Sequence, residues 1–107
     1  MTLDPCRIGL EGTVVYGPNR KVLHYEYLVC VPNLGKLRWY VFHNTKRYQP
    51  WGVSVDLALM DGLNRFSTKH DAIYHIIYCT RNLLHKANPM LALLADFTEL
   101  EEEANRP

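Results

Sequence analysis

Cations and aromatic rings gather between residues 20 and 48, where six Lys and Arg side chains stand against one acid, Glu26. Aromatic rings stack on nucleic-acid bases or on planar protein groups, while cations bind phosphates or carboxylates. This segment and the end of the loop that follows it therefore predict a binding face for a larger macromolecule. The residues assigned to this face are Arg38, Tyr40, Phe42, Lys46, Arg47, Tyr48 and Trp51. The alternative is that the aromatic residues only favour strands and the cations only face solvent.

Two kinds of partner fit this chemistry. A protein or ribonucleoprotein suits the Arg, Tyr and Trp of the loop at 44–52, because these types are enriched in binding hot spots. A nucleic acid would use the same rings and cations, but the signature of the RNA-recognition motif does not occur in the sequence. The alternative for Tyr48 and Trp51 is that they fold back to close the edge of a sheet.

A second candidate surface lies on the helix expected over 68–87. Tyr74, Tyr78, Arg81 and His85 are spaced so that they share one stripe of that helix, opposite its isoleucines. Tyr and His are unusual on a solvent-facing surface. The stripe predicts contact with a protein partner or with a second copy of the chain, and the alternative is that the tyrosines pack on the second helix or on a loop.

The C-terminal end is acidic, and this changes the meaning of the formal net charge of +1. Residues 96–107 contain five acids and one arginine, which leaves the rest of the chain basic. The candidate residues of this acidic end are Glu99, Glu101, Glu102 and Glu103. We expect them near the negative end of a helix dipole, where acids are disfavoured. The acidic end either docks on a basic surface or is a solubilising helix terminus.

Catalytic and cofactor chemistry has little support in the sequence. A His43-centred small enzyme is the third functional alternative, but it needs the fold to bring His43 to Asp56 or Asp61. No His-x-x-x-His pair or Cys/His cluster predicts a zinc site, so no metal is expected. Phosphate-binding glycine loops do not occur, so no nucleotide cofactor is expected. Three widely spaced cysteines predict no disulfide framework.

The first half of the chain alternates apolar and polar residues with a period of two, which predicts strands. We expect these strands at 7–16, 21–31, 36–43 and 53–60. Short turns join the first three, so they form an antiparallel meander. The apolar face of the fourth strand comprises Val53, Val55, Leu57 and Leu59.

From residue 68 the apolar period becomes 3.6, which predicts helices. Thr68 is the expected cap of the first helix, with Asp71 near the positive end of its dipole. Asn88 and Pro89 end that helix and start a second one, which continues into the acidic end. The apolar stripe of the second helix comprises Met90, Leu93, Leu94, Phe97 and Leu100.

These elements predict a single α+β domain over residues 1–107, with two C-terminal helices packed on one face of a four-stranded antiparallel sheet. Residues 1–5 and 104–107 are expected to fray. A basic and apolar leader and a membrane-length apolar run are both missing, which predicts a cytoplasmic protein that does not bind membranes. The other sheet face is open or covered by a partner, and unpaired sheet edges make a homodimer an open alternative.

The leading functional hypothesis is a small non-enzymatic interaction protein that binds stoichiometrically to a larger partner. Small α+β chains without motifs are typical of inhibitors of host machinery from phages or mobile elements. Anti-CRISPR proteins are one such class, and the likeness is in character only. A nucleic-acid-binding module with a basic and aromatic sheet face is the alternative.

Overall fold

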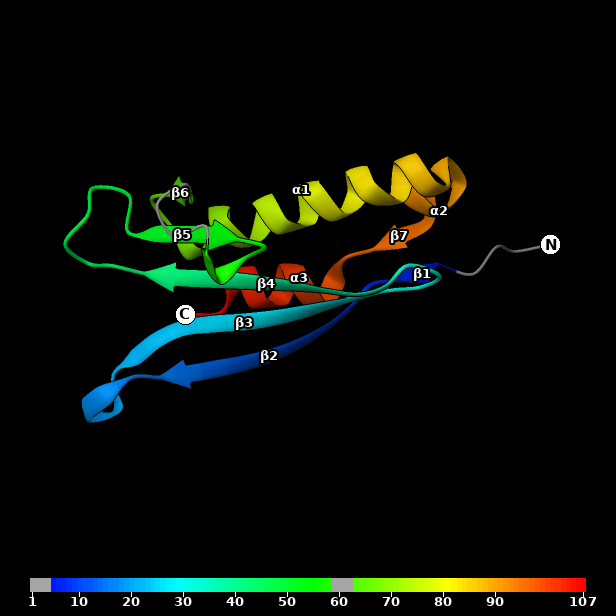
Figure 1. The fold of residues 1–107 in the computed structure, drawn as a ribbon. Helices are drawn as coiled ribbons and strands as arrows, with labels where there is room; N and C mark the ends of the chain where they lie inside the picture. Colours follow the sequence, from blue (N-terminus) through cyan, green and yellow to red (C-terminus); the bar gives the residue numbers. More distant parts are fainter. Residues whose placement is uncertain (1–4, 59–62) are drawn as a thin grey trace.

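The computed structural model describes residues 5–58 and 63–107, and it confirms the predicted α+β class. Its main sheet is antiparallel with five strands in the order β2-β3-β4-β5-β6. The strands are β2 (Gly9–Tyr16), β3 (Val22–Val31), β4 (Gly35–His43), β5 (Trp51–Ser54) and β6 (Asn64–Phe66). The helices are α1 (Lys69–Ala87), α2 (Pro89–Leu94) and α3 (Thr98–Asn105). Figure 1 shows α3 behind β3 and β4 and α1 along the β5 side of the sheet.

The β2–β3–β4 meander forms as the alternating pattern predicts. A short 3-10 turn (Pro18–Arg20) joins β2 to β3, and Gly17 donates a backbone hydrogen bond to the carbonyl of Lys21 across it. Between β3 and β4, Asn33 and Gly35 take left-handed backbone angles, with φ of 69° and 90°. Asn tolerates this region and Gly enters it without a steric penalty, which is why this turn can be so tight.

The fourth predicted strand is shorter than expected and shifted along the chain. β5 begins at Trp51 and ends at Ser54, whose hydroxyl both donates to the Asp56 carbonyl and accepts from the Asp56 amide. The Asp56 carboxylate then accepts from the Ala58 amide at 2.9 Å. Side chains that bond nearby backbone groups compete with sheet pairing, so Val55 and Leu57 are exposed rather than in the core. Leu59 and the rest of the predicted strand lie outside the described residues.

A fifth strand, β6, was not predicted. It is only three residues long and pairs Phe66 with Trp51 and Asn64 with Val53. Its sequence, Asn-Arg-Phe, is too short to show an alternating pattern. The sheet therefore has five strands in the described part of the chain, where the sequence predicted four.

The first helix agrees with its prediction at both ends. The Thr68 hydroxyl accepts a hydrogen bond from the Asp71 amide at 3.1 Å, and Asp71 lies in the first turn. The Asn88 side chain then caps α2 by accepting from the Met90 amide, also at 3.1 Å. Pro89 occupies the first turn of α2, where its missing amide hydrogen carries no cost.

The prediction of one continuous second helix was wrong. Ala95 and Asp96 are extended as β7 (Ala95–Asp96) and pair in parallel with β1 (Cys6–Arg7), and the Ile8 amide donates to the Asp96 carbonyl at 3.0 Å. Pairing with the N-terminal segment thus interrupts the helical pattern, and α3 starts afresh at Thr98. Of the predicted apolar stripe, Met90 and Leu93 in α2 are exposed, whereas Phe97 and Leu100 are buried.

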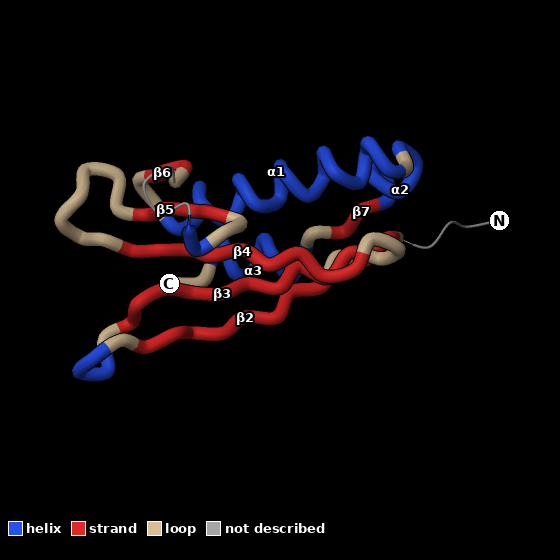
Figure 2. Tube along the Cα trace, viewed as in Figure 1, coloured by secondary structure: helices blue, strands red, loops and turns tan. Residues whose placement is uncertain are grey.

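The core lies between the sheet and the helices. Alternate residues of β3 and β4, such as Val29 and Val41, meet Ile73 and Ile76 of α1 and Leu100 of α3. α3 continues to Asn105, although we expected residues 104–107 to fray, because Ala104 is buried in this core. Figure 2 shows that α1, α2 and α3 do not cover the near face of β2, β3 and β4.

Candidate interaction surface

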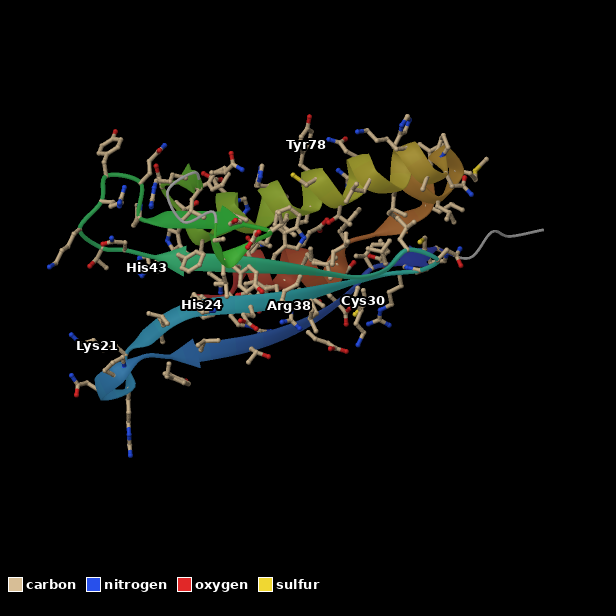
Figure 3. The ribbon with its side chains drawn as sticks, viewed as in Figure 1. Lys21, His24, Cys30, Arg38, His43 and Tyr78 are labelled. Atoms are coloured by element: carbon tan, nitrogen blue, oxygen red, sulfur yellow. The ribbon has the colours of Figure 1, made fainter. Side chains whose placement is uncertain are left out.

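The sheet face opposite the helices is the candidate interaction surface, and we call it the helix-free face. It carries the residues of each strand that alternate with the core residues. Registered pairs set its layout: Glu26 lies opposite Tyr40, Leu28 opposite Arg38, and Cys30 opposite Lys36. The tyrosine, the leucine and the cysteine are each half-buried, so the middle of the face is apolar and accessible. Figure 3 shows Arg38 and Cys30 along β3 and β4.

Charges of both signs surround this apolar middle. The Lys36 ammonium lies 3.4 Å from the Glu11 carboxylate, and both side chains are more than half exposed. Within residues 5–58 and 63–107, Arg38 has no ion-pair partner, so its guanidinium is available to a carboxylate of another molecule. The face is therefore mixed in charge rather than uniformly basic.

His24 lies at one end of the helix-free face, and it is buried although it alternates with the core residues of β3. Its ring lies between Phe42 and Tyr40, with centroids 5.1 and 5.9 Å away. Its Nε2 lies 3.2 Å from the Glu26 carboxylate, while its Nδ1 has no hydrogen-bond partner in the described part of the chain. Phe42 and Tyr40 are thus both partly occupied by packing on His24, and both are half-buried.

The loop at 44–50 carries the most exposed of the predicted site residues. The Asn44 amide donates to the Pro50 carbonyl at 2.8 Å, and the Asn44 side chain accepts from the Lys46 amide, so the loop is held by its own backbone. Lys46 and Arg47 are exposed, and Tyr48 is 96% exposed. Tyr48 therefore does not fold back on the sheet. Figure 1 places this loop at the same end of the molecule as the β2–β3 turn.

Trp51 does not join this surface. It lies on the helix side of the sheet, where its ring stacks on His43 at 4.2 Å between centroids and on Tyr25 at 6.2 Å. It is half-buried there and closes the sheet edge beside Phe66, which is the alternative that the sequence left open for it. The predicted set is thus divided between the two sides of the sheet.

The stacking with Trp51 also fixes the position of His43. In the described residues no carboxylate is hydrogen-bonded to His43, and the Asp56 carboxylate bonds the Ala58 amide instead. Asp61, the other predicted acid, lies outside the described residues. Over the described ranges no group of three or more His, Cys, Asp or Glu side chains is arranged to hold a metal ion.

The stripe on α1 is exposed along its length. Tyr78 is 63% exposed and points away from the sheet in Figure 3, so it does not pack on the second helix or on a loop. Tyr74 stacks on His70 with ring centroids 4.4 Å apart, and the Arg81 guanidinium lies over the Phe97 ring at 4.9 Å. His85 is exposed in the last turn of α1. Two of the four side chains thus have local partners, which leaves a narrower free surface than the spacing suggested.

The four glutamates of the acidic end have different surroundings. Glu103 accepts from the Tyr27 hydroxyl and the Lys69 ammonium, both at 3.0 Å, and it is 15% exposed. Glu99 accepts from the Leu10 amide at 3.2 Å and pairs with Arg7. Glu101 and Glu102 are exposed.

The expectation about the helix dipole was wrong for two of these glutamates. Glu99 and Glu101 lie in the first turn of α3, because this helix begins only at Thr98. Their charges therefore favour the positive end of its dipole. The segment that we expected at the C-terminus of a long helix thus contains the N-terminus of α3, where these two charges are favourable.

One feature of the helix-free face had no signal in the sequence. A hollow of about 420 Å³ lies at the β1 end of the sheet, between the β3–β4 turn and the start of β2. Cys30, Lys36 and Arg7 line it together with Gly9 and Gly35. The apolar neighbours of Cys30 in the sequence are typical of a core position, but the cysteine lies on the face opposite Val29 and Val31 and is half-buried. Arg7 lies just before β2 and is held beside the hollow where β1 pairs with β7.

Comparison with protein-family models, with curated proteins and with solved structures gave no match for this chain. Its surfaces are therefore interpreted from their own chemistry. None of the helices in the described residues combines the length and the apolar character that a membrane span requires.

Proposed function

We propose that this chain is a non-enzymatic interaction protein that binds a larger protein partner stoichiometrically through its helix-free face. The observation that supports this most directly is the one-sided placement of the helices. They bury the face of the sheet that carries Val29 and Val41, and leave Leu28 and Tyr40 without a helix to cover them. A half-exposed apolar centre with a polar rim is the usual anatomy of a protein interface.

The charges favour a protein over a nucleic acid as the occupant of this face. Glu11 and Glu26 lie among Lys36 and Arg38, so a phosphate backbone laid across the face would meet acids as well as cations. A protein surface can match charges of both signs, and such matching gives specificity. Arg38 and Tyr40 are the residues expected to contribute most, because Arg and Tyr are enriched at hot spots.

A nucleic-acid partner is the second candidate, and one observation favours it. The cations Lys46 and Arg47 are exposed beside Tyr48, and at the same end of the molecule the β2–β3 turn exposes Arg20 and Lys21. No ion-pair partner for any of the four cations is found in the parts of the chain that the structure describes. Unpaired cations beside a free aromatic ring suit a single strand.

The finer form of the proposal is an inhibitor of host machinery, encoded by a phage or mobile element and acting in the cytoplasm. Its support is the combination of small size, one domain and a broad polar-rimmed face without an assembled catalytic group among the described residues. An inhibitor of this kind needs only a surface that covers part of its target, which fits the one-sided fold.

The test is capture of the partner from a lysate of the organism that carries the gene, followed by mass spectrometry. Arg38→Glu should abolish the complex, because it places a like charge where a carboxylate is expected. Lys86→Glu makes the same charge change on the exposed end of α1 and should leave the complex intact. A complex that survives Arg38→Glu contradicts the proposal. Loss of the complex on nuclease treatment would assign the face to nucleic acid instead.

A further inference from the structure

The outer edge of β2 carries backbone groups that the fold does not use. β2 is an outer strand of the sheet, and among the described residues it forms ladder pairs only with β3. The Leu10 amide donates to the Glu99 carboxylate and therefore points away from β3. In an antiparallel pair the outward direction recurs at every second residue, so Gly12 and Val14 also direct their N–H and C=O groups outward.

The C-terminal part of the chain covers only the first half of this edge. The Ile8 amide donates to the Asp96 carbonyl at 3.0 Å, and the Leu10 amide to the Glu99 carboxylate at 3.2 Å. No group in residues 5–58 and 63–107 bonds the amides of Gly12 and Val14. An open edge of this kind is a template for an added strand.

A pocket of about 360 Å³ lies beside the open edge, between β2 and α3. Gly12, Tyr27 and Glu102 are among the residues that line it. Gly12 keeps the pocket open, since a Cβ at this position would lie 3.2 Å from Cε1 of Tyr27. A strand paired with Gly12 would direct the side chain opposite that glycine into the pocket.

The charge of the pocket favours a cationic side chain at the position opposite Gly12. Three glutamates and one arginine line it. Glu103 is already paired with Lys69 and Arg106, and Glu99 with Arg7. Glu102 is exposed and has no ion-pair partner over the described ranges. A Lys or Arg of the added strand would supply the missing cation.

We propose that an extended segment of a partner protein pairs antiparallel with β2 at Gly12–Val14 and places a Lys or Arg beside Glu102. A second copy of this chain is a poorer occupant, because its own β2 carries no cation and it would bring a second Glu102 to the same place. This surface is separate from the helix-free face, so the inference extends the proposed function rather than depending on it.

The test uses the full chain and two synthetic peptides, Thr-Val-Thr-Lys-Thr-Val-Thr and the same peptide with Glu in place of Lys. The Lys peptide should slow amide hydrogen exchange at Gly12 and Val14, measured by NMR, and should bind more tightly than the Glu peptide. Val14→Pro removes one outward N–H without touching the β3 ladder and should weaken binding at least about tenfold. Val14→Ala keeps the N–H and should lose less affinity than Val14→Pro.

Glu102→Gln removes the charge that we expect to attract the Lys of the peptide. Glu102 is exposed, so this variant should fold like the unchanged chain. It should lower the affinity for the Lys peptide by roughly threefold and remove the preference over the Glu peptide. Equal binding of the two peptides to the unchanged chain, or no protection of Gly12 and Val14, overturns the proposal. A concentration-dependent dimer in light scattering that Val14→Pro abolishes would assign the edge to a second copy. Arg38→Glu should not change peptide binding, which separates this test from that of the helix-free face.

Discussion

Replacing Glu103 by alanine should destabilise the fold strongly, because one carboxylate joins three elements. Its Oε1 accepts from the Tyr27 hydroxyl of β3 and from the Lys69 ammonium of α1, both at 3.0 Å, while Oε2 pairs with Arg106 at 3.2 Å. The Glu103 side chain is 15% exposed and that of Lys69 is 17% exposed. The carboxylate therefore links α3 to the sheet and to the start of α1 in a place that water reaches poorly.

The size of the effect follows from these contacts. A hydrogen bond to a charged acceptor is worth about 1.5–3 kcal/mol, and Tyr27 would lose one. Lys69 would lose its ion-pair partner at a site that water still reaches in part, which adds on the order of 1 kcal/mol. Arg106 is 67% exposed and adds little. The sum is about 3 kcal/mol, which lowers Tm by about 12–24 °C in a domain of this size.

Urea unfolding followed by tryptophan fluorescence measures this loss. Glu102→Ala is the matched control on the same helix, and it should change the free energy of unfolding by less than about 0.5 kcal/mol, since Glu102 is exposed. Glu103→Gln keeps an acceptor for the Tyr27 hydroxyl and should cost less than the alanine variant. A loss below about 0.5 kcal/mol for Glu103→Ala would refute the reasoning. So would additive effects of Tyr27→Phe and Glu103→Ala, because two groups in contact should be coupled.

The same contact gives an alkaline signature. Burial, and then the charge of Glu103, raise the pKa of Tyr27 above its usual value of 10. In the unfolded chain this tyrosine loses its proton near pH 10, while in the folded chain it stays protonated. The unfolded state therefore binds fewer protons, and stability falls as pH rises above 10. Tyr27→Phe should make that fall shallower.

Two other predictions concern a histidine and a turn. Burial lowers the pKa of His75, so the folded state disfavours its protonation and the free energy of unfolding should fall as pH drops through about 6.5. His75→Gln should reduce this fall when unfolding is measured between pH 5 and 7. An unchanged fall would show that His75 is not its cause. Gly35→Ala should cost about 1 kcal/mol in urea unfolding, because φ is +90° there and nothing within 4 Å would meet the new Cβ, which leaves backbone strain as the cause. Gly17→Ala is its control, with φ of −89° and only ordinary contacts, and equal losses at the two glycines would show that strain is not the cause.

The parts of the fold that the sequence predicted are those with strong local signals. The period of two in β2, β3 and β4 and the cap at Thr68 act over a few neighbouring residues, so the chain itself displays them. The break at Ala95–Asp96 has no such signal. Its cause is a parallel pairing with Cys6–Arg7, which are distant in the sequence, while the apolar spacing of residues 90–100 fits a helix throughout. The sequence did not predict β6 for the same reason, because this strand forms by pairing with β5, which begins at Trp51 and is distant from it in the sequence.

The candidate site was predicted in its residue types more than in its geometry. Alternation placed Arg38 and Tyr40 together on one face, and the structure keeps them there. Trp51 was assigned to the same face because of its residue type alone, since Trp is enriched at binding hot spots. Its place on the helix side depends on where β5 begins, and the loop at 44–50 is two residues shorter than the sequence indicated. A shift of one residue in a strand moves a side chain to the opposite face.

The break before α3 also changes how the charges of the chain should be interpreted. The sequence indicated an acidic end opposite a basic half, with both available to partners. Because α3 starts at Thr98, Glu99 and Glu103 are used to hold the strand edge and Tyr27, and only Glu101 and Glu102 stay free. The loop cations Lys46 and Arg47, in contrast, have no ion-pair partner in the described residues. Glu99 and Glu103 pair with Arg7, Lys69 and Arg106, so cations as well as acids are taken up within the fold. The free acid at Glu102 therefore acts as a local feature of the β2 edge rather than as part of a polyanionic tail.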